Sequence, residues 1–141
     1  MEINFFCEKI FFKIKEKTKI RKWLINISHD YGLLIGVINI IFTNNSEIFK
    51  INRKYLNHKY NTDIITFDYS NSKKISGDLF ISIDTVKRNS RVYNVDFYTE
   101  LHRVIVHGFL HLLKYTDSSA SDKKIIREKE NYFLKYLSKI K

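Results

Sequence analysis

The apolar residues in the last third of the chain recur at helical spacing, and this pattern constrains the fold more than any other feature. One set begins after the candidate N-cap Asp96 and comprises Phe97, Leu101, Val104, Ile105, Gly108, Leu112 and Leu113. After a polar break at 118–121, Ser119 and Asp122 have the spacing of a capping box. A terminal helix is therefore expected over 122–137, with its inward side chains at Ile125, Ile126, Tyr132, Phe133, Tyr136 and Leu137.

Shorter alternating or β-branched segments in the rest of the chain predict strands at 3–7, 36–42, 64–67 and 79–83. A helix is expected within 11–30, and a short one should follow the capping residues 44–46 and end near Leu56. Gly77 precedes Asp78, which is either a turn residue or a partner of a metal-bound histidine. The expected fold is a single α+β domain over 1–141, with a small mixed sheet of about four strands packed with helices.

Length and composition fit one domain, because 141 residues with a 44% hydrophobic fraction can bury an adequate core. The longest apolar stretch, 33–42, is interrupted by Gly36 and Asn39 and is too short for a membrane-spanning helix. The first residues do not resemble a signal peptide, so we expect a cytoplasmic protein that does not bind a membrane. The single cysteine, Cys7, cannot form an internal disulfide and is expected to be buried.

The chain carries a formal net charge of +10, which favours a polyanionic partner such as nucleic acid. A second interpretation stays open, because a chain rich in Lys, Ile and Asn and without Pro is typical of an AT-rich coding sequence. The basic cluster formed by Lys13, Lys15, Lys17, Lys19, Arg21 and Lys22 is interpreted as a solvated surface, since no aromatic side chains that could stack on bases alternate with it.

The candidate chemistry lies in the segment 107–117. His107 and His111 are four residues apart, so on a helix they are separated by about 40° and can face one ion. Asp117 follows at loop distance and can supply an oxygen, which makes an open zinc site with room for a water molecule. Such water, acidified by zinc, is a hydrolytic nucleophile. Two helical histidines can also simply form hydrogen bonds, and the Glu of His-Glu-x-x-His peptidases is replaced here by Gly108.

The same segment resembles the signature of the YbeY family of rRNA maturation endoribonucleases, His-Gly-x-Leu-His-Leu-x-Gly-Tyr-x-His. The matching residues are His107, Gly108, Leu110, His111, Leu112 and Tyr115. Upstream, Asn52 and Tyr55 resemble the family's Asn-x-x-(Tyr/Phe) stretch, 62–67 resembles Thr-Asp-Val-Leu-Ser-Phe, and 77–81 resembles its Gly-Asp-Ile strand. The three matches occur in the family's order, so together they are far more specific than any one alone.

Three positions depart from the family pattern. Asp117 stands where the family has its third histidine ligand, and a His2Asp set remains a sound zinc site. Lys114 replaces a glycine at the helix end, which costs on the order of 1 kcal/mol if that residue is left-handed. Leu56 replaces an arginine that the family is thought to use in catalysis, so the catalytic group beyond the metal-bound water is unknown. Its charge could come from Arg53, His58 or Lys59, which are the candidate RNA-binding residues.

The resemblance implies a single-strand-specific endoribonuclease with one Zn²⁺ per chain, acting in maturation of the 16S rRNA 3′ end and in ribosome quality control. Its partners would be single-stranded RNA and the small ribosomal subunit or its associated proteins. Single-strand preference needs stacking surfaces, for which Tyr55, Tyr60, Phe67 and Tyr69 are the candidates. Two alternatives remain: a non-catalytic ribosome-assembly factor with a structural metal, and a zinc peptidase.

Overall fold

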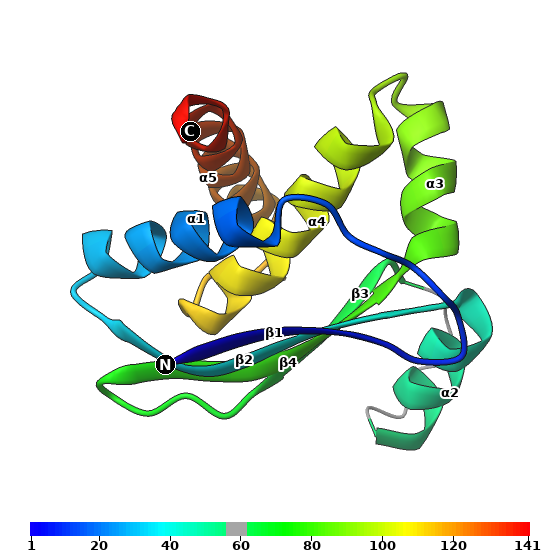
Figure 1. The fold of residues 1–141 in the computed structure, drawn as a ribbon, viewed down its shortest axis with the longest axis horizontal. Coiled ribbons are helices and arrows are strands. Elements are labelled where there is room, and N and C mark those ends of the chain that lie inside the picture. The colour runs from blue at the N-terminus through cyan, green and yellow to red at the C-terminus, as the bar shows by residue number, and fades with distance from the viewer. Residues whose placement is uncertain (56–61) are drawn as a thin grey trace.

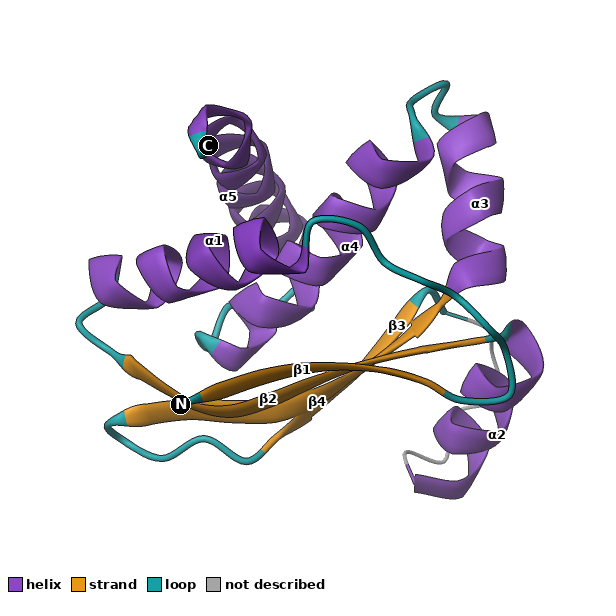
Figure 2. Ribbon diagram, in the orientation of Figure 1, coloured by secondary structure: helices purple, strands orange, loops and turns teal. Residues whose placement is uncertain are grey.

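The computed structural model describes residues 1–55 and 62–141, and these residues form the α+β fold that the sequence predicted. Figures 1 and 2 show these elements in the same view. The elements, in chain order, are β1 (Glu2–Cys7), α1 (Lys17–Asp30), β2 (Leu34–Thr43), α2 (Asn45–Tyr55), β3 (Ile64–Asp68), β4 (Lys74–Ser82), α3 (Ile83–Val92), α4 (Phe97–Leu112) and α5 (Ala120–Lys139).

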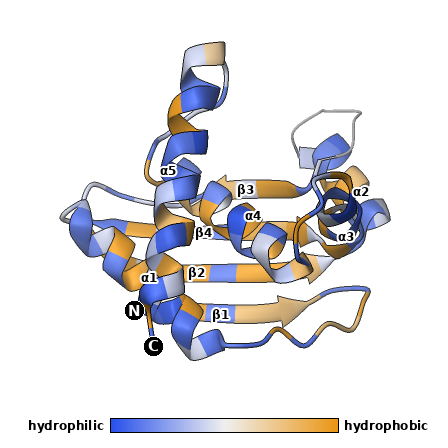
Figure 3. Cartoon of the chain, turned by 90° about the horizontal axis from the view of Figure 1, so that it is seen from above, coloured by the Kyte–Doolittle hydropathy of each residue, from blue (hydrophilic) through white to orange (hydrophobic). Residues whose placement is uncertain are grey.

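The sheet has the strand order β1-β2-β4-β3. β1 and β4 both run parallel to β2, whereas β3 runs antiparallel to β4 as the partner in a hairpin. The sheet is therefore mixed and four-stranded, as the sequence predicted. β3 lies at one edge, and Figure 3 shows this order from above, with α1, α4 and α5 crossing over the strands.

The main core lies between the sheet and the helices α1, α4 and α5, which cover one face (Figure 1). The indole of Trp23 on α1 is fully buried and donates to the carbonyl of Phe133 on α5 at 2.9 Å. A smaller apolar cluster joins α2 to the opposite face through Ile48, Ile51 and Ile65. The main core also packs Ile64 of β3 against Gly108 of α4, and these two elements line the candidate site.

Most predicted elements are present, with shifted boundaries. Two of the three predicted caps form: the side chain of Asn44 accepts from the amide of Glu47, and that of Ser119 accepts from the amide of Asp122. Asp96 occupies the N-cap position of α4 as predicted, but its side chain makes no capping hydrogen bond. The predicted strand at 79–83 in fact begins at Lys74, and Ile83 already belongs to α3. α3 was not predicted, although Ser82 caps it by accepting from the amide of Thr85.

Three side chains differ from expectation. Ile125 and Tyr132 were expected to point inward, but they are 46% and 63% exposed because α5 buries a narrower stripe through Ile126, Phe133 and Leu137. Cys7 is exposed rather than buried, since it ends an edge strand where its thiol interacts with the backbone of Phe12. Within the described residues, no helix combines the length and apolar character that crossing a membrane requires.

Candidate metal centre

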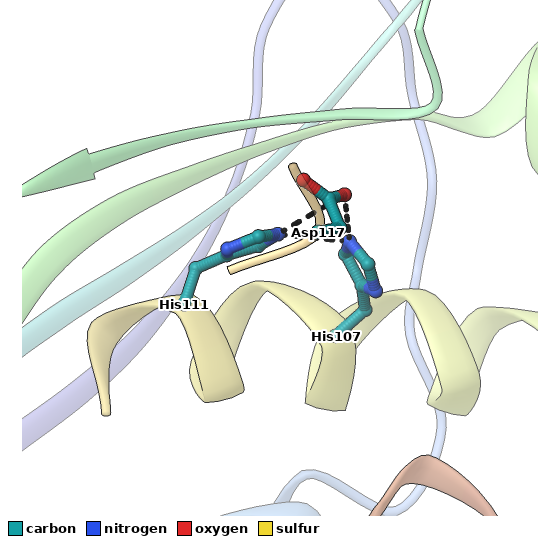
Figure 4. Close-up of side chains that lie close together, drawn as sticks. All are labelled: His107, His111 and Asp117. Atoms are coloured by element: carbon teal, nitrogen blue, oxygen red, sulfur yellow. Dashed lines mark hydrogen bonds and ion pairs between the residues drawn. The ribbon is translucent and has the colours of Figure 1, made fainter. Parts of the chain in front are cut away.

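His107 and His111 occupy successive turns of α4, and Asp117 approaches them from the loop that follows the helix (Figure 4). The two Nε2 atoms are 2.9 Å apart. Asp117 Oδ2 lies 3.6 Å from Nε2 of His107 and 3.7 Å from Nε2 of His111. The structure thus brings the three predicted ligands together, with one donor atom of each within 4.8 Å of the others.

The chain reverses direction after α4 through a left-handed residue, and this turn is what returns Asp117 to the histidines. The amide of Tyr115 donates to the carbonyl of Leu110 at 3.1 Å, and that of Lys114 donates to His111 at 3.0 Å. This is a Schellman motif, which requires a left-handed residue at its first position outside the helix. That residue is Lys114, with φ of 76°. Lys114 therefore adopts the left-handed conformation that favours the glycine of the family pattern, and the conformational cost considered from the sequence applies.

Each histidine is oriented through its Nδ1 atom by a hydrogen-bond acceptor. His107 Nδ1 lies 2.6 Å from Glu130 Oε2, and His111 Nδ1 lies 3.0 Å from the carbonyl oxygen of Tyr115. Because both partners only accept, each Nδ1 carries the proton, and in the neutral rings both Nε2 lone pairs face each other and Asp117. Three electron-pair donors converging on one point repel unless a proton or a cation lies between them, so the donor set fits a metal ion.

The same environment gives the two imidazoles different affinities for a proton. Burial disfavours the charged form of His107, but the Glu130 carboxylate outweighs burial and raises the pKa of this histidine. Burial and the neighbouring His107 lower the pKa of His111. When His107 is protonated in the metal-free site, its Nε2–H can donate to Nε2 of His111, and the proton then lies between the two rings.

Glu130 is a functional residue that the sequence interpretation missed. It is only 4% exposed, and its carboxylate also accepts from Arg103 at 3.0 Å and lies 3.6 Å from Arg127. The hydrogen bonds with His107 and Arg103 keep the pKa of Glu130 low despite its burial, so it is a charged partner for His107. One signal was available: Glu130 lies four residues after Ile126 and three before Phe133, on the inward stripe of α5.

A pocket of about 700 Å³ opens beside the metal-ligand group. Two further carboxylates line it, Asp63 before β3 and Glu100 in the first turn of α4. Burial raises the pKa of both, and the Coulombic repulsion between them adds to the shift of Glu100. Both were missed as site residues, although Asp63 belongs to the matched 62–67 stretch and Glu100 interrupts an apolar helical stripe.

The candidate RNA-binding residues are less well placed. Arg53 is exposed on α2 and is not one of the residues lining the pocket, whereas its neighbour Asn52 is. His58 and Lys59 lie outside the described residues, as do Leu56 and Tyr60. Instead, Lys123 and Arg127 of α5 line the pocket with exposed charged groups.

Two predicted details can now be settled. Asp78 is a strand residue, neither in a turn nor beside the histidines, and it accepts a hydrogen bond from Asn39 of β2 at 3.0 Å. Gly108 faces the sheet: a Cβ there would lie 2.5 Å from Cδ1 of Ile64 and 3.1 Å from a methyl of Leu79. The position that carries the general base in His-Glu-x-x-His peptidases therefore points into the core here.

Comparison with known proteins agrees with the resemblance in the sequence. Residues 3–138 match the family described as endoribonuclease YbeY. The endoribonuclease YbeY of Parabacteroides distasonis is 42% identical over 137 residues, covering 97% of this chain and 96% of the relative. That of Azobacteroides pseudotrichonymphae is 52% identical over 110 residues, covering 78% and 79%. A solution structure from Thermotoga maritima shares the fold, with a TM-score of 0.66 and 24% identity over 96% of this chain and 88% of that one.

Proposed function

The chain belongs to the endoribonuclease YbeY family, and from that premise we propose that it is a metal-dependent endoribonuclease that cleaves single-stranded RNA. The observation that best supports this proposal is the convergence of His107, His111 and Asp117 at one wall of the pocket. A hydrolytic metal site and a net charge of +10 are used together in phosphodiester hydrolysis.

The ligands of the proposed ion are His107 Nε2, His111 Nε2 and a carboxylate oxygen of Asp117, with one Zn²⁺ per chain. Two imidazoles and one carboxylate suit zinc and leave a coordination position open. When bound, the ion supplies Lewis acidity to a phosphoryl oxygen and lowers the pKa of water. Glu130 and the Tyr115 carbonyl hold both rings in the tautomer that ligation needs.

Asp63 is our candidate for the proton acceptor that the sequence left unassigned. Its carboxyl group lines the pocket, and its interaction with His107 places it near the ligand group. Burial raises the pKa of Asp63, and a higher pKa makes its carboxylate a stronger base. Lys123 and Arg127, whose charged groups are exposed at the pocket, would hold the flanking phosphates.

The biological setting follows from the family resemblance. We propose that the substrate is rRNA, that cleavage contributes to maturation of the 16S rRNA 3′ end and to ribosome quality control in the cytoplasm, and that the small subunit or its proteins are partners. A peptidase function lacks support, because position 108 is a glycine that faces the sheet and offers no side chain as general base. A non-catalytic assembly factor with a structural metal is the alternative that an experiment must separate.

The test combines metal content with RNA cleavage. Wild type, His111→Ala, Asp117→Ala and Asp63→Asn are compared by metal analysis, circular dichroism and cleavage of a labelled single-stranded RNA and its duplex. His29→Ala is the matched control, because His29 is an exposed histidine on α1, away from the pocket. We expect near-stoichiometric metal in wild type, His29→Ala and Asp63→Asn, and loss of metal in the other two variants.

Cleavage should follow metal content, except that Asp63→Asn keeps its metal and loses turnover. Single-stranded RNA should be cut and the duplex spared. If metal-loaded wild type cuts neither RNA, or if folded His111→Ala without metal cuts as fast as wild type, the proposal is wrong. Unfolding of the metal-free variants together with inactive wild type would instead support the assembly-factor alternative.

A further inference from the structure

The pocket extends well beyond the metal-ligand group. Its far end lies between α3 and α4, where Asn89, Tyr93, Glu100 and Arg103 line it. Glu100 and His107 are seven residues apart on α4, so they share a helix face and are separated by about 10 Å along the axis. A volume of about 700 Å³ exceeds the space that an ion and a phosphate need and is typical of pockets for whole small molecules.

Glu100 is the residue of this far end that most clearly indicates a ligand. The side chain belongs to a residue that is only 4% exposed, yet its carboxylate has no hydrogen bond and no ion pair among the residues the structure describes. The oxygens of Glu100 are not among the enclosed polar atoms without a partner, so the carboxylate opens on the pocket, where a ligand can supply the donors that the protein does not. Burial and the nearby Asp63 raise the pKa of Glu100, as expected for a carboxylate in this position.

The neighbouring arginines do not fill the role of donor. Arg103 directs Nη1 to Glu130 at 3.0 Å and Nη2 to Asn131 at 2.9 Å. Arg127 approaches the same Glu130 oxygen at 3.6 Å. Arg103 is therefore committed to Glu130 and Asn131, the exposed Arg127 lies nearer to Glu130 than to Glu100, and Glu100 receives only the longer-range field of both arginines.

We propose that the far end of the pocket binds a nucleobase of the RNA, and that Glu100 selects guanine. This inference rests on the proposed function, since it names the base next to the cleaved phosphate. The Watson–Crick edge of guanine offers two parallel donors, N1–H and N2–H2, which match the two oxygens of a carboxylate. Adenine and cytosine present one donor beside a ring-nitrogen acceptor, and uracil presents one donor between two carbonyls. Each of these bases would therefore place an acceptor against an oxygen of Glu100, which also only accepts.

The walls of the far end suit a flat base. Tyr93, at the end of α3, is 56% exposed and lines the pocket, so one face of a base can stack on its ring. Asn89, one turn earlier on α3, is half-buried and offers both a donor and an acceptor. Glu100 thus determines specificity at this end, while the metal ligands at the other end act on any phosphodiester.

Binding of mononucleotides tests this assignment without requiring cleavage. Zinc-loaded full-length protein is titrated with the 5′-monophosphates of guanosine, adenosine, cytidine and uridine, followed by NMR. All four share the phosphate, so a difference among them reports the base alone. We expect the guanosine nucleotide to bind roughly ten-fold more tightly than the others, in line with a bidentate base contact.

Two variants locate the preference. Glu100→Gln keeps the side-chain shape but replaces one acceptor with a donor, so it should remove the preference for guanine. Glu128→Gln is the matched control, since Glu128 is an exposed glutamate on α5 that does not line the pocket, and it should bind as wild type does. Equal binding of the four nucleotides by wild type, or an unchanged preference in Glu100→Gln, would overturn the inference.

The remaining outcomes separate this inference from the proposed function. A second equivalent of zinc that Glu100→Gln loses would mean that the far end holds a cation, and the inference would be wrong. Guanine preference in a protein that cuts no RNA would preserve the base site and overturn the endoribonuclease proposal. Metal-dependent RNA cleavage with no base preference in binding would do the reverse.

Discussion

The two ends of the pocket each contain a buried glutamate, and the two glutamates differ in their hydrogen-bond and ion-pair partners. Glu130 and Glu100 are both 4% exposed. Glu130 has close partners in His107, Arg103 and Arg127, whereas Glu100 has no hydrogen bond or ion pair within the described parts of the chain. The metal end is thus organised before any ligand arrives, and the far end lacks the donors that a ligand would bring.

The largest effect should come from truncating Glu130. Glu130→Ala leaves the partly buried Arg103 without its carboxylate, so we expect a loss of about 3 kcal/mol in unfolding free energy, measured by urea denaturation of the metal-free protein. Glu128→Ala, an exposed residue on the same helix, serves as the control and should be nearly neutral. A loss below about 1 kcal/mol would show that the network does not stabilise the metal end.

The isosteric change at the same position should affect the metal more than the fold. Glu130→Gln keeps a hydrogen-bond acceptor for His107 but removes the charge that makes the imidazole a better ligand. We expect zinc affinity, measured by competition with a chelating dye, to fall roughly ten- to a hundred-fold. The guanine preference of the far end should not change, and a parallel loss there would mean that the two ends are not independent.

Substitution of Glu100 should raise the free energy of unfolding, whereas truncation of Glu130 should lower it. Glu100→Gln removes a buried charge that has no donor, so we expect thermal or urea unfolding at pH 7 to show a gain of about 1–2 kcal/mol. The pKa of Glu100 is raised in the folded protein, which means that the folded state binds more protons and wild-type stability falls as pH rises through this range. The advantage of the variant should therefore shrink as pH falls through the raised pKa of Glu100, and it should be lost once pH is below the ordinary glutamate pKa. Destabilisation at neutral pH would contradict the comparison.

The smallest effect concerns the turn that returns Asp117 to the metal end. Lys114→Gly relieves a left-handed lysine with φ of 76° but removes an exposed ion pair with Asp68. We expect a net gain in unfolding free energy of about 1 kcal/mol or slightly less, with zinc affinity unchanged. Lys114→Ala is the control, because it loses the same ion pair without gaining conformational freedom, and it should not be stabilised.

Much of the fold was predictable, because local patterns carry it. Hydrophobic period identified all four strands and both C-terminal helices, and capping chemistry at Asn44 and Ser119 located two helix starts. α3 was missed because its ten residues are mostly polar, although its few apolar side chains recur at helical spacing. Ile125 and Tyr132 were misplaced since period alone does not fix how wide a stripe the neighbouring elements cover.

The sequence by itself determined the chemistry that lies on one local segment: two histidines on one helix face, an aspartate at loop distance and a lysine where the family has a glycine. Only the tertiary structure decided what those groups contact. Glu130 reaches His107 across 23 positions of sequence, and Asp63 reaches the same site from its position directly before β3. Such pairings depend on how α4 packs against α5 and β3. The physical reason is that periodicity specifies which face of an element is buried, whereas the partner of a buried charge is set by the packing of separate elements.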